Sequence, residues 1–132
     1  MSAGKYDITI EQGSDFSLQL TVQDGGVAKN LTGYSVRGQM RATVDASTIA
    51  ASFTGAISNA TGGVIIVSLP YTTTDDISPG MYLYDIELYT ASSVQKLIKG
   101  SATVLGELTK WDFQILLVLF QKILYKLQKI QV

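Results

Sequence analysis

The side chains of this sequence that could do chemistry are mainly carboxylates. Asp75 and Asp76 are adjacent in a threonine-rich segment, whereas Asp85 and Glu87 are two residues apart and would share one face of a strand. Such groups can act as an acid–base pair, or bind Ca²⁺ with Asp75 joining the second pair. The competing interpretation, which we favour, is that the first pair caps a turn and the second forms cross-strand ion pairs. The basic partners expected for that second pair are Arg37, Arg41 and Lys99.

Other reactive side chains are missing from the sequence. The 132 residues include no cysteine and no histidine. Disulfides, thiolate nucleophiles, Cys/His zinc sites, histidine bases and the usual catalytic triads are therefore excluded. The glycine pairs Gly25-Gly26 and Gly62-Gly63 lack the spacing of a phosphate-binding loop. We expect a protein that is not an enzyme and that uses no cofactor and no metal.

Tyrosines offer a second kind of site, a carbohydrate-binding platform. The sequence alternates so that Tyr82 and Tyr84 share a face with Ile86, and we expect both to pack in a core. Tyr71 and Tyr89 stay as candidate surface contacts of a carbohydrate-binding adhesin.

Composition predicts one folded domain with a hydrophobic core. Hydrophobic residues make up 46% and charged residues 16% of the 14.2-kDa chain, which is typical of globular rather than disordered proteins. A net charge of −1 argues against a basic surface for nucleic acid. The longest apolar run, residues 115–120, is far shorter than a membrane span, and the first residues do not resemble an export signal. We expect a protein made inside a cell, with neither nucleic acid nor membrane as partner.

The elements that would position these side chains are strands. Apolar and polar residues alternate with period two through residues 1–106, and Asp24-Gly25-Gly26 is a hairpin turn signal. Val64–Leu69 is apolar on both faces apart from Ser68, which is typical of a strand covered on each side. A short helical turn is expected at Asp75–Ile77. Strands are expected at residues 6–10, 16–22, 34–41, 49–54, 64–69, 82–89 and 94–104, the last with a bulge near Lys99-Gly100. The pattern predicts an all-β domain over residues 1–106, an immunoglobulin-like antiparallel β-sandwich.

Residues 107–132 change to a helical period. Large apolar residues recur at alternating spacings of three and four, the a and d positions of a heptad, and others fall beside that stripe at e. We expect an amphipathic C-terminal α-helix from about Leu108 to Gln131, with Trp111 packing onto the sandwich. The expected partner-binding residues are Trp111, Phe113, Leu116, Leu117, Phe120, Ile123, Leu124, Leu127 and Ile130.

Two arrangements would bury this helix. It could fold back onto its own sandwich, or it could gather other chains into a coiled coil or grip a partner groove. The two sheets of a sandwich already cover each other, which favours the second arrangement. Phe113 and Phe120 at a positions are bulky for two strands, so we expect a homo-oligomer that is a trimer or larger.

Three segments carry a family resemblance. Tyr6–Gly13 with Phe16–Leu20, then Lys29–Arg37 with its Asn-Leu-Thr-Gly-Tyr turn, then Ile77–Leu88 with Gly-Met-Tyr-Leu-Tyr-Asp-Ile-Glu occur in this order. Together they resemble the immunoglobulin-like domains of tailed-bacteriophage virion proteins, in particular the N-terminal domain of phage baseplate upper proteins. The resemblance covers about residues 5–106, and the helix from Glu107 is not part of the pattern.

The resemblance implies a structural role without catalysis. It implies an assembly or adaptor protein of a phage virion, in the tail, baseplate or fibre attachment, that is assembled in the host cytoplasm and binds other virion structural proteins. The alternatives are a head-decoration protein and the carbohydrate-binding adhesin module.

Overall fold

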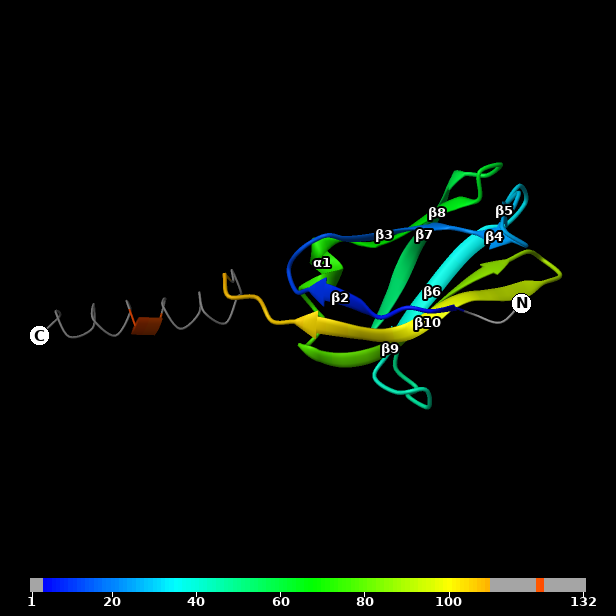
Figure 1. Cartoon of the computed structure of the whole chain (residues 1–132). Coiled ribbons are helices and arrows are strands. Elements are labelled where there is room, and N and C mark those ends of the chain that lie inside the picture. The colour runs from blue at the N-terminus through cyan, green and yellow to red at the C-terminus, as the bar shows by residue number, and fades with distance from the viewer. Residues whose placement is uncertain (1–3, 110–120, 123–132) are drawn as a thin grey trace, which may run out of the picture.

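The computed structural model describes residues 4–109 and 121–122. In these ranges the chain is almost entirely β-strand (Figure 1). The strands are β1 (Gly4–Lys5), β2 (Ile8–Glu11), β3 (Phe16–Thr21), β4 (Gln23–Asp24), β5 (Val27–Ala28), β6 (Ser35–Arg41), β7 (Ala51–Asn59), β8 (Val64–Leu69), β9 (Gly80–Tyr89) and β10 (Val94–Leu105). A single short helix, α1 (Tyr71–Thr74), is described between β8 and β9. The predicted all-β class is confirmed.

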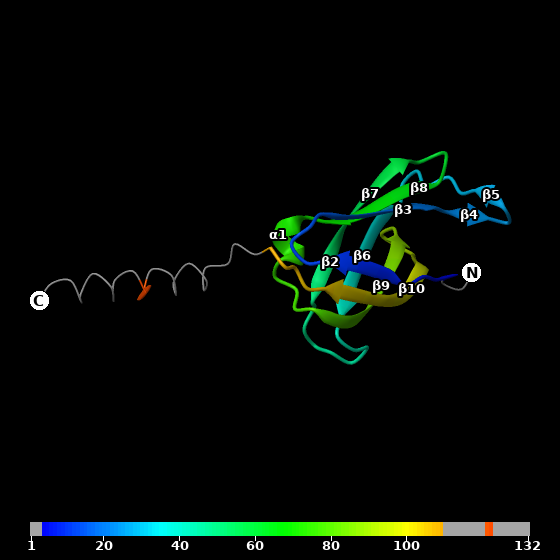
Figure 2. The same cartoon turned by 60° about the vertical axis from the view of Figure 1, so that its left-hand side comes forward.

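One curled sheet contains most of the strands. Its order is β1-β10-β9-β6-β7-β8-β3, and β2 also pairs with β10. The curl occurs at β7, because its first residues pair with β6 while Thr54–Asn59 pair with β8. Figures 1 and 2 show the result, with β3, β7 and β8 on one side of the molecule and β2, β9 and β10 on the other. β1 and β2 run parallel to β10, whereas the sequence predicted antiparallel neighbours throughout.

The space inside the curl holds the core. Residues from both sides of the sheet contribute to one buried cluster, including Ile10, Met40, Ile65, Ile86 and Leu88, each no more than 1% exposed. Phe53 links the two sides, since its ring packs against Phe16 at 6.2 Å and against Tyr84 at 6.0 Å between centroids. Tyr84 is buried in this cluster and Tyr82 packs against it, as the alternation predicted.

The hairpin β4–β5 forms at the predicted turn. Gly25 and Gly26 have φ values of 62° and 81°, and glycine adopts such positive φ values without strain.

Two local predictions differ from the structure by a few residues. The helical turn begins at Tyr71 rather than at Asp75, because the carbonyl of Pro70 accepts the first turn's hydrogen bonds from Thr73 and Thr74. The bulge in β10 was expected near Lys99-Gly100 and lies between Lys96 and Ile98, closer to the start of the strand. The extra residue there places Ile98 opposite core residue Ile86, and keeps Lys96 and Lys99 both on the outer face.

The predicted C-terminal helix lies almost wholly outside the described residues. So do all nine expected partner-binding residues, from Trp111 to Ile130. Leu108 and Thr109 form a bend, whereas Gln121 and Lys122 are helical and exposed. In the ranges 4–109 and 121–122, we find no helix with the length and apolarity that crossing a membrane requires.

Candidate functional site

An ion-pair lattice crosses three strands on the outer face of the sheet. The register places Arg37 of β6, Glu87 of β9 and Lys96 of β10 side by side. Arg37 Nε donates to Glu87 Oε1 at 2.5 Å, and Lys96 Nζ binds Glu87 Oε2 as well as Asp85 Oδ2, the latter at 3.1 Å. The Arg37 guanidinium also lies over the ring of Tyr89, 4.1 Å from its centroid. These cations cover Glu87 so well that it is only 8% exposed.

The lattice corrects part of the predicted pairing. Arg37 is a partner of Glu87, as expected, but the second partner is Lys96, which the sequence analysis did not name. Arg41 lies opposite Leu83, four residues along β9 from Glu87, and its side chain instead donates to the carbonyl oxygen of Ala46 at 2.8 Å. The β10 bulge is the reason that Lys96 falls directly opposite Glu87.

The protonation states of the lattice favour a structural role. Partial burial acts to raise the pKa of Glu87, but the hydrogen bonds from Lys96 and Arg37 outweigh it and lower the pKa. The hydrogen bond to Glu87 in turn raises the pKa of Lys96. A carboxylate held ionised between two cations is a poor general acid or base at neutral pH.

A Ca²⁺ site at the carboxylates finds no support in the described chain. Within residues 4–109 and 121–122, no three acidic side chains lie close enough to hold a metal ion. Asp75 ends α1, whereas Asp85 and Glu87 are occupied by Lys96 and Arg37 in the middle of β9.

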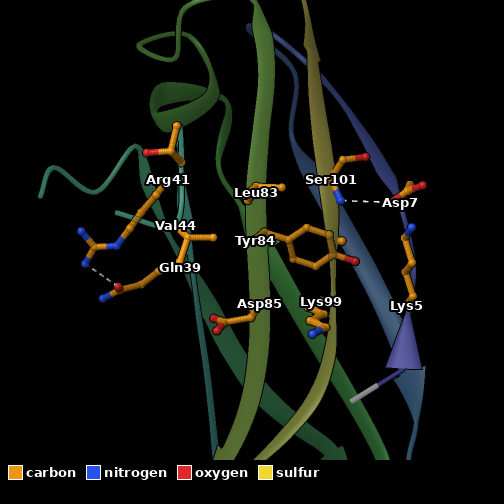
Figure 3. Close-up of a pocket in the computed structure, with 12 residues that line it drawn as sticks. Lys5, Asp7, Gln39, Arg41, Val44, Leu83, Tyr84, Asp85, Lys99 and Ser101 are labelled. Atoms are coloured by element: carbon orange, nitrogen blue, oxygen red, sulfur yellow. Dashed lines mark hydrogen bonds between the residues drawn. The ribbon is translucent and has the colours of Figure 1, made fainter. Parts of the chain in front are cut away.

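A hollow of about 560 Å³ adjoins the lattice (Figure 3). Arg41, Gln39 and Val44 line one side, Leu83 and Asp85 of β9 form the middle, and Lys99, Ser101, Lys5 and Asp7 line the other side. Asp7 is fixed because its Oδ1 accepts a hydrogen bond from the Ser101 backbone N–H at 3.0 Å, which lowers its pKa. This hollow was not predicted, because its lining is brought together from four strands and the β6–β7 loop, and none of these segments carries a motif for it.

The segment that follows β10 is held by hydrogen bonds at its first residues. The side chain of Gln12 donates to the carbonyl of Ile77 at 3.0 Å and accepts from the backbone N–H of Glu107 at 3.2 Å. Beside it, the fully buried Thr74 hydroxyl accepts from Gly13 N–H at 3.1 Å and donates to the Ser14 carbonyl at 2.8 Å. We call this set of contacts the exit junction.

Exposed apolar side chains lie near the exit junction. Met81 is 70% exposed and Leu108 is 101% exposed, and Leu105 is 47% exposed on β10 diagonally across from Met81. Tyr71, at the start of α1, is 58% exposed.

The two candidate carbohydrate-binding tyrosines lie far apart. Tyr71 is next to the β2–β3 connection, since its N–H donates to Asp15, whereas Tyr89 ends β9 at the opposite end of the molecule (Figure 1). The structure therefore does not bring them together into one platform.

Charge is divided unequally between the two sides of the curled sheet. The lattice and the hollow concentrate it on the side of β6, β9 and β10, whereas β3, β7 and β8 contain no charged residue at all. We call the outer surface of these three strands the neutral face. A signal for it was visible in the sequence, which has no charged residue between Asp45 and Asp75.

Comparisons with known proteins add little to this picture. No family model matches the sequence, and no curated protein matches it. Among solved structures, the chain is similar to InlP of Listeria monocytogenes, with 19% identity and a TM-score of 0.44 over 78% of this chain and 27% of that one. The chain thus spans about a quarter of that protein, and a likeness this distant carries no argument about fold or function.

Proposed function

We propose that this chain is a structural assembly or adaptor protein of a phage virion. Residues 1–106 would form an immunoglobulin-like β-sandwich that docks on one virion component, and helix 107–132 would gather copies of the chain or grip a second component. A place in the tail, baseplate or fibre attachment is the first choice, and a head-decoration role is the alternative.

The observation that carries the proposal is how the β domain buries its own core. In the described part of the chain, every buried apolar side chain of the core lies between Ile8 and Val104. The described strands bury this core among themselves, with Phe16, Leu18 and Leu20 of β3 left half-buried on its inner side, which leaves little room for the long apolar stripe expected in residues 113–130. That supports the inference that the stripe is covered by other chains.

The segments that resemble phage domains all have structural roles, which agrees with the proposal. The first forms β2 and β3, and the last forms β9 with its ion pairs. In the middle segment, Asn30 Oδ1 accepts hydrogen bonds from the N–H and the hydroxyl of Thr32, and Leu31 is 1% exposed in the core. This Asx turn directs the chain into β6.

The exit junction suits an adaptor. Because Gln12 holds the N–H of Glu107, the chain leaves the β domain at a defined place only a few residues before the heptad pattern starts at Phe113. Apolar side chains exposed at the same end would pack against whatever surrounds that exit.

The oligomer is tested by the mass of the full chain in solution. By light scattering, the wild-type protein should have the mass of an oligomer of several chains. The double variant Phe120→Asp/Ile123→Asp should have a lower mass, while the circular dichroism signal of the β domain stays unchanged. The matched control is Gln121→Asp with Lys122→Asp, at exposed b and c positions of the same helical turn, which should keep the wild-type mass. An unchanged mass for the Phe120/Ile123 variant would count against the proposal.

The virion assignment needs a separate measurement. Mass spectrometry of purified particles from the producing phage should detect the chain at a fixed copy number per particle. Its absence from intact particles would refute the assignment, whatever the oligomeric state.

A further inference from the structure

The neutral face ends in an open edge. β3 is the last strand in the sheet order, and within residues 4–109 and 121–122 its only hydrogen-bonded neighbour is β8 (Figure 2). An unpaired edge displays free N–H and carbonyl groups that can accept another strand.

The backbone groups at this edge belong to three residues. The N–H of Val22 donates to the carbonyl oxygen of Gly63 at 2.7 Å. This pair continues the register of β3 with β8, in which Thr21 lies opposite Val64. Because hydrogen-bonding direction alternates along an antiparallel strand, Leu20, Leu18 and Phe16 also point their backbone groups toward β8. The N–H and carbonyl groups of Ser17, Gln19 and Thr21 therefore point away from the sheet.

Nothing in β3 guards this edge. Protective edge strands carry lysine, proline, a bulge or an inward-pointing charge, and β3 has the sequence Phe-Ser-Leu-Gln-Leu-Thr with an unbroken register to β8. Its inward-facing residues are also incompletely covered. Phe16, Leu18 and Leu20 are only half-buried, although they pack against the core.

We propose that β3 pairs antiparallel with β3 of a second copy of this chain, with Gln19 on the two-fold axis. In this register Gln19 faces Gln19 of the other copy, and Ser17 faces Thr21. These pairs use every outward-pointing backbone group, which gives six new backbone hydrogen bonds. Registers shifted by two residues leave one of the three residues of β3 without a partner in β3 of the other copy.

The side chains favour a second copy as the occupant. In the proposed register polar residues meet polar residues on the outer face, and Leu18 meets Leu20 on the core face, in a non-hydrogen-bonded pair where side chains are closest. Because β3, β7 and β8 contain no charged residue, the β3 edges of two copies can approach each other without like-charge repulsion within these strands. Such an isologous contact joins two copies by the same residues on each.

The outer side chains of β8 continue the uncharged surface of β3. Val64, Ile66 and Ser68 point outward and are only partly exposed, and two of these three are apolar. A second copy beside β3 extends this surface into a continuous neutral sheet across both chains.

This contact goes beyond the proposed function and does not depend on it. The β3 edge consists of described strand residues, and the helical contact involves residues 113–130. A contact between two short edge strands buries a modest area. It is therefore tested by disulfide trapping as well as by the mass in solution.

Disulfide trapping tests the register directly, because the chain has no cysteine of its own. Directly opposed residues of antiparallel strands are about 5.5 Å apart at Cα, within disulfide range. Gln19→Cys should form a covalent two-chain species under mild oxidation of the full-length protein. Thr54→Cys, exposed on the same face but two strands from the edge, should not. No enrichment of the Gln19→Cys dimer over the Thr54→Cys control would overturn the proposal.

A charge swap gives a second, independent test. Gln19→Lys places two like charges opposite each other on the axis, as does Gln19→Glu, so each variant alone should lose the contact. Mixing the two should restore it as a Lys–Glu pair. Both variants are made in the Phe120→Asp/Ile123→Asp background, and their mass in solution is measured by light scattering over a series of protein concentrations.

The results separate this proposal from the helix proposal. If the Phe120→Asp/Ile123→Asp background keeps the wild-type mass, the proposal that the helix forms the oligomer is refuted. The charge variants still test the β3 contact in that case. If the two charge variants and their mixture all behave like the background, the β3 contact is wrong, whatever the helix does. If the contact were made with a different protein, mixing the charge variants would restore nothing, which also refutes the proposal.

Discussion

The phenol of Tyr84 donates a hydrogen bond to the backbone carbonyl oxygen of Tyr6 at 2.5 Å, across 78 positions of sequence. The bond crosses β10, because Tyr84 is opposite Gly100 in the register of β9 and β10. Tyr6 is held from a second direction, since its N–H donates to the carbonyl of Lys99 at 2.9 Å. The residues between β1 and β2 are thus hydrogen-bonded to both β9 and β10.

Removing this hydroxyl should cost stability. Tyr84→Phe loses the hydrogen bond and leaves the Tyr6 carbonyl partly unsatisfied, so the free energy of unfolding in urea should fall by about 1 kcal/mol near neutral pH. Tyr71→Phe, on a tyrosine that is 58% exposed, should change it little. Equal effects of the two substitutions would contradict the role given to the Tyr84–Tyr6 bond.

The same hydroxyl predicts a loss of stability at high pH. Burial, and then the negative charges of Asp7 and Tyr6, raise the pKa of Tyr84 to about 12, from an ordinary value of 10.0. Its contribution to folding is complete below the unfolded pKa and is lost as pH rises from there through the folded value. Wild-type stability should decline above about pH 10, and the Tyr84→Phe variant should decline less steeply. Urea unfolding at several alkaline pH values measures both slopes.

The ion-pair lattice predicts the opposite behaviour at low pH. The pKa of Glu87 is lowered in the folded protein, so its contribution is present above the ordinary glutamate value of 4.5 and is lost as pH falls through the folded value. Glu87→Gln should reduce the acid sensitivity of unfolding, and should destabilise by about 1 kcal/mol near neutral pH, because Arg37 loses its carboxylate partner and Lys96 keeps only Asp85. Glu11→Gln, at an exposed position, is the control. Identical pH profiles for wild type and the Glu87→Gln variant would show that the lattice contributes nothing.

Gly100 should tolerate no side chain. A Cβ there would lie 2.1 Å from the carbonyl oxygen of Tyr6 and 2.7 Å from its carbonyl carbon, and both atoms are backbone that cannot simply rotate away. Gly100→Ala should therefore lower the free energy of unfolding by roughly 1–3 kcal/mol. At Gly4 an added Cβ meets nothing closer than 3.7 Å, so Gly4→Ala should be neutral. A Gly100→Ala variant as stable as wild type would mean that β1 and β2 do not lie against β10 as described.

The exit junction should loosen when Gln12 is shortened. Gln12→Ala removes the hydrogen bonds to Ile77 and Glu107 together, and should cost roughly 1–2 kcal/mol of unfolding free energy. The backbone N–H of Glu107 should also exchange with solvent faster in hydrogen-exchange experiments. Gln23→Ala, at an exposed position of β4, should change neither quantity. Unaltered exchange at Glu107 would show that Gln12 does not hold the exit.

Local periodicity in the sequence was enough to predict most of the strands and the direction of their side chains, although β1 was not predicted and β7 runs to Asn59 instead of ending at residue 54. The alternation around Tyr82 and Tyr84 correctly assigned both to the core side, and Asp24-Gly25-Gly26 correctly predicted a hairpin. These features depend on neighbours within a few residues, and such neighbours are visible in a sequence. The same logic predicts the helix of residues 107–132 and its partner-binding stripe, which stay predictions because they lie outside the described residues.

Pairing between distant segments was decided only by the tertiary structure. By alternation alone, Glu87 could have met Arg41 or Lys99 as readily as Arg37. Lys96 could not be predicted as its partner, because one bulged residue in β10 shifts the register there. The hollow, the parallel pairing of β2 with β10 and the open edge of β3 likewise join or expose segments that are far apart in the sequence. The physical reason is that alternation fixes which face of a strand is apolar, whereas the choice of neighbour and register depends on burying all those faces together.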